Sequence, residues 1–223
     1  VQALQGGADA VFIQHPWTRR QSGVQDYIEP FESFIVFRTL AYHLGGSRYL
    51  GEFEPSPGIC ALIFDYDGRG CLFVWRQENH RFSALQDCLK LVLGENPQQI
   101  DLWGNRTELV TNNHVTEVRV GHNPFLLTNI NTRLALLRSS VKLNPSTIEA
   151  SIVRQQTTLS FYNTFTGPIT GRFRLLLNQP ETNDWQIEPS MVTFSLQPGQ
   201  EFNQTIDMQF PRNELGGPKT LQA

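Results

Sequence analysis

The chain has 223 residues, of which 39% are hydrophobic and 17% charged, and it carries a formal net charge of −3. Such a composition is typical of a globular protein long enough to build one or two hydrophobic cores. The mild acidity gives no electrostatic footprint for nucleic acid or for an anionic membrane surface. No apolar run approaches the roughly 20 residues that span a bilayer.

Residues 1–46 predict one β/α unit. The first five residues are typical of a helix tail, and Gly6-Gly7 suit its end. Residues 10–13 form a continuous apolar run, as expected of a parallel strand buried on both faces, and residues 14–28 are polar and predict a loop. Apolar side chains then recur at helical spacing over residues 31–44, with Pro30 in the first turn and Gly45-Gly46 at the end, which predicts a helix.

One such unit cannot bury its own apolar faces, so two interpretations are open. Either it caps the β-rich remainder of the chain alone, or it is the last unit of a larger α/β body. The second is favoured because the chain opens without methionine in what looks like the end of a helix. We therefore expect a fragment of a longer protein.

Residues 47–145 predict a run of antiparallel strands. Turn signals recur about every 8–12 residues between segments of alternating polarity, which is typical of a β-sandwich. The strongest is Asp67-Gly-Arg-Gly70. With Gly68-Arg69 as a two-residue hairpin loop, Cys71 is expected opposite Tyr66. The expected strands cover residues 48–53, 59–66, 71–76, 89–93, 100–103, 107–110, 115–120 and 125–130, followed by a short helical turn at 134–138 and a strand at 140–143.

The three cysteines predict neither a disulfide framework nor a zinc site. In the expected register Cys60 faces Gln77, far along the ladder from Cys71, so the two cannot bridge. We expect Cys60, Cys71 and Cys88 to be small buried hydrophobic residues.

A second β-rich domain is predicted after a boundary at Asn144-Pro-Ser146. Strands at 157–162, 171–177, 191–196 and 202–210 resemble a truncated immunoglobulin-like sandwich without its disulfide, with Trp185 in its core. The predicted fold class is mainly β. It comprises two antiparallel β-sandwich domains, residues 47–145 and 146–223, preceded by one terminal β/α unit of a β/α barrel, residues 1–46.

We assign no catalytic residue, cofactor or metal ligand from the sequence. The motifs of serine hydrolases, zinc proteases, phosphate loops and dinucleotide folds are missing, and no pair of carboxylates is placed for glycoside hydrolysis. Asp65-Tyr-Asp67 opens like a calcium loop. However, Arg69 and Arg76 stand where acidic ligands belong, which favours a hairpin turn.

Trp17 and His15 are the candidate substrate-binding residues. Residues just beyond the C-terminal end of a barrel strand line the active site of β/α barrels. A tryptophan there offers a flat apolar ring on which the C–H face of a sugar packs, and His15 is a neighbouring hydrogen-bonding group. The alternative is that Trp17 folds back onto the α/β core.

The chain resembles the C-terminal part of bacterial multidomain glycoside hydrolases of the retaining (β/α)8-barrel clan, including xylosidase-like and planctomycete-type proteins. The segment 6–17 looks like their eighth strand and 31–46 like their eighth helix. Segments 60–75 and 101–105 are similar to the sandwich packed on that barrel, and 163–199 to an appended immunoglobulin-like module. In that family the two catalytic glutamates lie on the fourth and seventh strands, which would precede residue 1, and Trp17 matches the eighth-strand aromatic at the substrate.

This resemblance implies a C-terminal accessory region of a carbohydrate-active enzyme, secreted, periplasmic or on the cell surface. Its expected partners are a poly- or oligosaccharide and the upstream barrel of the same chain, with neither nucleic acid nor membrane. The alternative is a non-enzymatic surface or adhesion protein whose sandwiches serve as binding or spacer modules. A third hypothesis, independent glycan binding by residues 47–145, requires exposed aromatic rings; we expect Trp75 and Trp103 to be core or interface residues instead.

Overall fold

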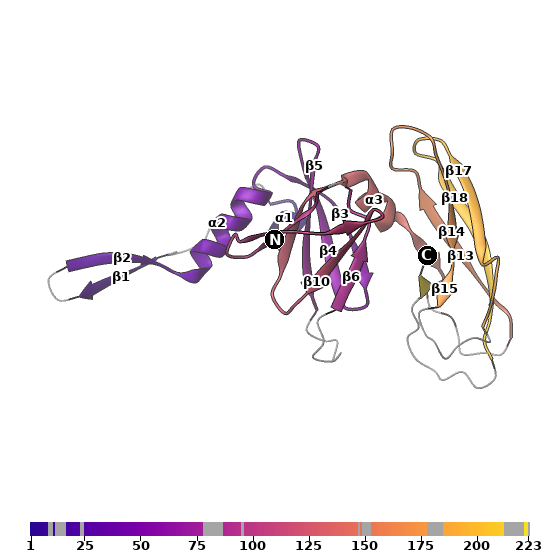
Figure 1. Ribbon diagram of the computed structural model, residues 1–223, viewed down its shortest axis with the longest axis horizontal. Coiled ribbons are helices and arrows are strands. Elements are labelled where there is room, and N and C mark those ends of the chain that lie inside the picture. Colours follow the sequence, from indigo (N-terminus) through magenta and orange to yellow (C-terminus); the bar gives the residue numbers. More distant parts are fainter. Residues whose placement is uncertain are drawn as a thin grey trace. The chain divides into compact units, whose positions relative to one another are not determined.

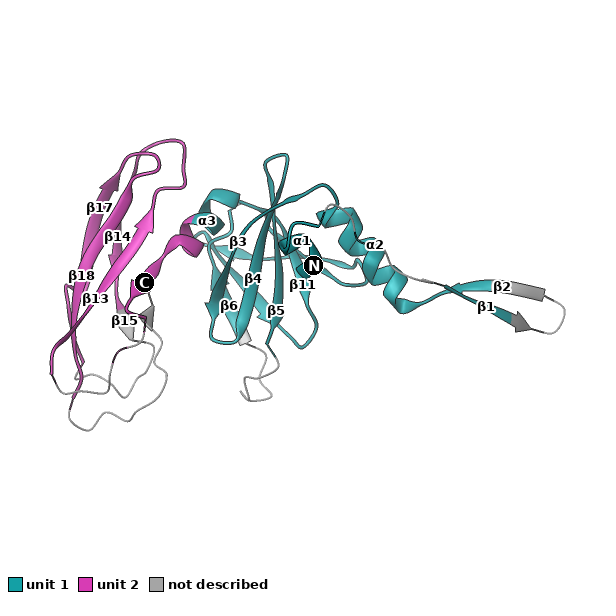
Figure 2. Ribbon diagram, turned by 180° about the vertical axis from the view of Figure 1, so that it is seen from behind, with its two compact units in different colours: residues 1–136 teal, residues 137–223 magenta. Residues whose placement is uncertain are grey.

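The computed structural model describes residues 1–8, 11, 17–22, 25–77, 87–94, 96–146, 148, 153–177, 185–211 and 221–222. The chain is mainly β, with 53% strand and 15% helix arranged in several antiparallel sheets, none of them closed, so the coarse predicted fold class is confirmed (Figure 1). It divides into two compact units, Val1–Leu136 and Leu137–Ala223 (Figure 2). Within the described part of the chain, no helix is long and apolar enough to cross a membrane.

The described part of unit 1 contains three antiparallel sheets, of which the two largest share a core. The larger has six strands, in the order β3 (Arg48–Ser56), β4 (Ile59–Tyr66), β5 (Arg69–Arg76), β11 (Phe125–Ile130), β7 (Gln98–Asp101) and β8 (Arg106–Glu108). The smaller has three, in the order β6 (Asp87–Leu91), β10 (Val115–Val120) and β9 (Thr111–Asn112). The predicted strands at residues 59–66, 115–120 and 125–130 are confirmed to the residue.

The hairpin between β4 and β5 forms as predicted, but in a different register. Its two turn residues are Asp67 and Gly68, both with positive φ, so that Tyr66 pairs with Arg69 and not with Cys71. Aspartate tolerates the left-handed conformation that such a two-residue turn requires at its first position, whereas arginine in the second position would be strained. The shift places Cys60 opposite Trp75, still far from Cys71 along the ladder.

The central strands of the large sheet are buried on both faces. On one face, Ile63 of β4 and Leu127 of β11 join a core shared with the smaller sheet. On the other face, the alternate residues Leu62 and Leu126 belong to a separate apolar cluster. All four side chains are inaccessible to solvent. A strand buried on both faces explains the continuous apolar runs in β4 and β5, where a half-exposed strand would alternate.

Helix α2 (Glu32–Leu44) covers this second face. Leu44 is buried in the apolar cluster and Leu40 packs against its edge, as do Val1 and Leu4 at the short helix α1 (Gln2–Gln5). Both helices were predicted by sequence, and both end at the expected glycines, Gly6 and Gly45.

Two predictions between these helices are wrong. Residues 14 to about 28 were predicted as loop, but β1 (Trp17–Ser22) and β2 (Gln25–Pro30) pair as antiparallel strands. Most of their described side chains are exposed, so their sequence lacks the alternation that signals a half-buried strand. Val11, within the predicted buried strand, is 40% exposed and lies in no strand, and the rest of that run lies outside the described residues.

Cys88 is exposed, which corrects its prediction as a buried residue. It lies on β6, where Leu89 and Leu91 point into the core shared by the two sheets. Because side chains alternate along a strand, Cys88 and Lys90 point to solvent. Cys71 is buried, as expected, whereas Cys60 is only partly buried.

Helix α3 (Thr132–Ser140) is longer than the predicted turn at 134–138. Asn131 supplies the reason, since its side-chain Oδ1 accepts hydrogen bonds from the backbone N–H of Arg133 and Leu134, at 3.0 and 3.2 Å. This N-cap lets the helix begin directly after β11.

Unit 2 contains one four-stranded sheet and two strand pairs. The sheet order is β12 (Lys142–Asn144), β13 (Gln155–Tyr162), β18 (Glu201–Gln209) and β16 (Gln186–Glu188); the pairs are β14 (Ile169–Arg174) with β17 (Met191–Leu196), and β15 (Leu176–Leu177) with β19 (Leu221–Gln222). Phe161 is fully buried, with its ring 4.7 Å from that of Phe173 and 5.0 Å from that of Phe194. Trp185, predicted in the core, is partly buried 4.1 Å from the Phe210 ring.

Candidate functional site

Trp17 begins β1 and is 52% exposed. Its ring meets the Phe34 ring of α2 edge-on, with centroids 6.3 Å apart, and this contact sets the position of the indole at the first turns of that helix. At this exposure, part of the Trp17 side chain is accessible to a ligand. His15, the other candidate, lies outside the described residues.

A second exposed tryptophan lies at the same end of α2. Trp103, predicted as a core or interface residue, is 41% exposed, which corrects that prediction. Its indole Nε1–H donates to Glu32 Oε1 in the first turn of α2, at 3.0 Å. Trp75 is partly buried against Phe73, as predicted, with their rings 5.8 Å apart.

The loop that carries Trp103 is held by one carboxylate. Asp101 Oδ1 accepts hydrogen bonds from the backbone N–H of Trp103 and of Asn105, each at 2.9 Å, and its Oδ2 accepts one from the Asn105 amide at 2.8 Å. Burial opposes ionisation of Asp101, but these hydrogen bonds outweigh it and lower the pKa of the carboxyl group. The loop therefore presents Trp103 in a preset orientation, which reduces the entropy lost when a ligand binds.

Helix α2 is apolar on two opposite faces. Leu40 and Leu44 face the large sheet, whereas Phe31, Ile35 and Tyr42 are exposed. At 100° per residue, the exposed three form a stripe about half a turn away from the buried two. Trp17 contacts Phe34 and Trp103 contacts Glu32, two positions apart on α2, so the two indoles meet opposite sides of its first turns. We call Trp17, Phe31, Glu32 and Trp103, which surround these turns, the aromatic surface.

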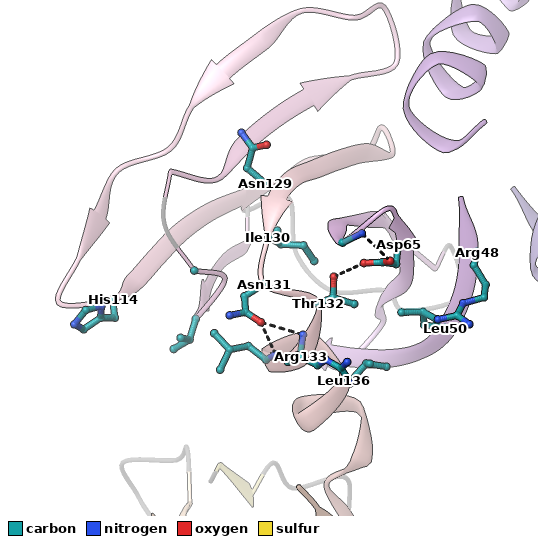
Figure 3. A pocket seen from close by; sticks show the side chains of 14 residues that line it. Arg48, Leu50, Asp65, His114, Asn129, Ile130, Asn131, Thr132, Arg133 and Leu136 are labelled. Atoms are coloured by element: carbon teal, nitrogen blue, oxygen red, sulfur yellow. Dashed lines mark hydrogen bonds between the residues drawn. The ribbon is translucent and has the colours of Figure 1, made fainter. Parts of the chain in front are cut away.

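A pocket of about 860 Å³ opens elsewhere in unit 1, within the size range of small-molecule sites. Figure 3 shows Arg48 and His114 on opposite sides of it, with Asp65 and Asn131 between them. The lining comes from the start of β3, the β4–β5 turn, the end of β6, the β9–β10 turn, β11 and α3.

The floor of this pocket is a fixed hydrogen-bond network. Asp65 Oδ1 accepts from the Thr132 hydroxyl at 2.9 Å, and its Oδ2 accepts from the Gly68 N–H at 3.2 Å. The Asn131 backbone N–H donates to the Leu93 carbonyl at 2.6 Å, which joins the end of β6 to the start of α3. The loops around the pocket are thereby held by contacts across the chain.

Among the described residues, neither region brings two carboxylates together. The aromatic surface offers flat apolar rings and a carboxylate already engaged with Trp103, which suits binding of a sugar ring better than chemistry on it. Within the ranges that the structure describes, no three His, Cys, Asp or Glu side chains gather in a way that could hold a metal ion.

Sequence reasoning identified Trp17 but missed Trp103 and Glu32. These two residues are 71 positions apart and meet only because α2 packs across the sheet that carries the Trp103 loop. The Asp101-Leu-Trp-Gly-Asn105 segment does carry a local signal, since Asp and Asn at its ends are typical of a side-chain-capped loop. That signal indicates a rigid loop, but not what the loop faces.

The pocket was not predicted either. Its polar residues are scattered from Arg48 to Arg133, and no motif connects them. A search for relatives adds no family to this picture: no protein-family model, curated protein or solved structure matches the chain.

Proposed function

We propose that this chain is the C-terminal accessory region of a carbohydrate-active enzyme of the glycoside hydrolase type, without catalytic residues of its own. The paired sheets of unit 1 form a β-sandwich that packs on the last helix of a β/α barrel, and unit 2 is an immunoglobulin-like module. The aromatic surface forms one wall of the sugar-binding cleft.

The observation that carries this proposal is the pair of exposed tryptophans at one end of α2. Trp17 and Trp103 come from segments far apart in the chain, yet both contact the first turns of the same helix. An exposed indole offers a flat apolar ring, and such rings suit a ligand that has apolar faces and hydroxyl groups. Sugar rings have both.

The two-faced character of α2 supports the structural half of the proposal. In a barrel with an attached sandwich, the last helix contacts the sandwich on one side and the barrel on the other. Leu40 and Leu44 make the first contact, and the exposed Ile35 and Tyr42 supply apolar surface on the opposite face for the second. An isolated amphipathic helix has one such stripe rather than two.

Native affinity electrophoresis through gels that contain plant or algal polysaccharides tests the sugar-binding half. We expect at least one neutral polysaccharide to retard the chain, and Trp17→Ala and Trp103→Ala each to weaken that retardation about tenfold or more. Val110→Ala, which truncates another exposed apolar side chain, is the matched control and is expected to bind as the unaltered chain does.

Two results would contradict the proposal. One is that no polysaccharide retards the unaltered chain. The other is that both tryptophan variants retain full retardation, which would place any sugar contact away from the aromatic surface. Circular dichroism of each variant verifies that the fold is kept, since both indoles are at least two-fifths exposed.

A further inference from the structure

We infer that the pocket between β3, the β4–β5 turn and α3 binds an acidic sugar, a short oligosaccharide that carries carboxylate or sulfate groups. This inference rests on the proposed function for the sugar class, but it concerns a site separate from the aromatic surface. Arg48 follows the C-terminal end of α2, whereas Trp17 and Trp103 contact the first turns of that helix.

The charge of the pocket indicates an anion. Two guanidinium groups, of Arg48 and Arg133, line it against one carboxylate, that of Asp65. The formal charge of these lining side chains is therefore positive, although the whole chain carries a net charge of −3. A positive pocket on an acidic chain attracts a negatively charged ligand against the overall field.

The hydrogen-bonding groups indicate an acceptor-rich ligand. Both oxygens of Asp65 already accept hydrogen bonds, from Thr132 and Gly68, so this carboxylate has fewer lone pairs left to compete with a ligand for the donors of the pocket. The Asn131 Oδ1 is engaged by the backbone of α3, and Figure 3 shows its amide nitrogen turned away from that helix. What the pocket offers is mainly donors, which suits oxygen-rich anions.

The backbone is shaped to present polar groups here. Between Thr128 and Ile130 the pairing of β11 with β5 shifts register, and Asn129 sits in this bulge with φ of 58°. A bulge re-aims the side chain that it carries, and Asn129 is one of the residues that line the pocket. Asparagine is among the few residues that accept this conformation readily.

Apolar side chains complete the lining and favour a sugar over a bare inorganic anion. Leu50, Leu134 and Leu136 are partly buried and contribute to the walls. Such side chains pack against the C–H faces of a pyranose ring, while its acid group and hydroxyls reach the donors. The volume of about 860 Å³ exceeds what a small anion needs.

Isothermal titration of the full chain at low ionic strength tests the inference with three probes: trigalacturonate, a sulfated galactose trisaccharide and neutral xylotriose. We expect one or both acidic probes to bind, and Arg48→Gln to weaken that binding about tenfold or more through loss of a charge-assisted hydrogen bond. Whichever acidic probe binds more tightly identifies the acid group. Arg172→Gln, which neutralises an exposed arginine on β14 of unit 2, is the matched control and is expected to have no effect.

A second variant separates binding from folding. Asn131→Asp keeps a side-chain oxygen for the α3 cap, because aspartate caps helices as well as asparagine does. It also replaces the amide donor with a negative charge, so we expect unchanged thermal stability together with at least a tenfold loss of affinity for the acidic probe.

Three results would overturn the inference. The first is that neither acidic probe binds, and the second is that the Arg48→Gln chain binds them as tightly as the unaltered chain. The third is that Trp17→Ala loses acidic-probe binding while Arg48→Gln keeps it. The last result would assign acidic sugars to the aromatic surface and leave the proposed function in place. The converse result is also possible: an acidic probe binds and needs Arg48, but no neutral polysaccharide retards the chain. That result supports the pocket and contradicts the aromatic surface as a sugar site.

Discussion

The indole Nε1–H of Trp103 donates a hydrogen bond to Glu32 Oε1 at 3.0 Å, joining the loop between β7 and β8 to the first turn of α2. The same loop approaches α2 a second time at Gly104, where a Cβ atom would lie 3.3 Å from Thr39 Oγ1. The helix is therefore held from the loop side as well as from the sheet side. The aromatic surface depends on this contact for its shape.

Removing the carboxylate should loosen Trp103 without unfolding the protein. We expect Glu32→Ala to accelerate hydrogen exchange at the Trp103 indole, because the hydrogen bond that protects it is lost, and to lower the free energy of unfolding by no more than about 1 kcal/mol, as is usual at an exposed site. Two-dimensional ¹H–¹⁵N spectroscopy of the indole signals measures the exchange. Glu117→Ala, which removes another exposed carboxylate in an ion pair with Lys90, should leave the Trp103 signal unchanged.

Gly70 should not tolerate a side chain. A Cβ atom there would lie 2.6 Å from Thr132 Oγ1 and 2.7 Å from the carbonyl oxygen of Ile130, under the floor of the pocket. We expect Gly70→Ala to lower the free energy of unfolding by about 1–3 kcal/mol through overpacking. Gly121→Ala is the control, since nothing lies within 4 Å of its Cβ position. Urea denaturation of both variants measures this cost. Equal midpoints for the two variants would show that β5 at Gly70 does not lie against Ile130 and Thr132 at the β11–α3 junction.

The double burial of the large sheet makes a prediction for two neighbours on β11. Leu126 faces the α2 side and Leu127 the side of the smaller sheet, and neither is accessible to solvent. We expect Leu126→Ala and Leu127→Ala each to lower the free energy of unfolding by about 2–5 kcal/mol, as core truncations do. Denaturation monitored by circular dichroism is the measurement. A cost below about 1 kcal/mol for Leu126→Ala alone would mean that α2 does not cover this face in solution.

Acid should destabilise unit 1 through His43. Burial at the end of α2, with the nearby positive charge of Arg106, lowers the pKa of His43 from its ordinary value of 6.5. The unfolded chain therefore binds the proton more readily. The His43 contribution to stability is complete above pH 6.5 and is lost as the pH falls from there through the lower folded pKa.

Substitution of His43 isolates this contribution. We expect His43→Gln to reduce the fall in urea midpoint between pH 7.5 and about pH 5. Arg106→Gln should reduce the fall in part, because one of the two causes of the lowered pKa is removed. Identical pH profiles for the unaltered chain and His43→Gln would rule out this histidine as the source. Asp101, whose pKa is also lowered, loses its contribution at lower pH than His43 does.

Local sequence signals predicted the elements whose cause is local. The helix at Glu32–Leu44 follows from apolar spacing and a terminal glycine pair, and the β4–β5 hairpin from a turn sequence that few other conformations accept. Alternation along residues 89–93 correctly placed Leu89, Leu91 and Leu93 inside. In each case the decisive interaction lies within a few residues, so the pattern alone carries the information.

What the sequence could not determine is what each surface faces. The exposed β1–β2 hairpin lacks an apolar pattern, and the exposure of Trp103 depends on α2. The β4–β5 register depends on which of two overlapping dipeptides, Asp67-Gly68 or Gly68-Arg69, forms the turn. The pocket joins Asp65 to Thr132 across 67 positions. The amino-acid sequence by itself determined the helix at Glu32–Leu44, the β4–β5 hairpin and the glycines that end the helices, because backbone preference and periodicity are short-range. Only the tertiary structure decided that the large sheet is covered on both faces and that two tryptophans and two arginines line separate surfaces, because those contacts depend on how distant segments pack.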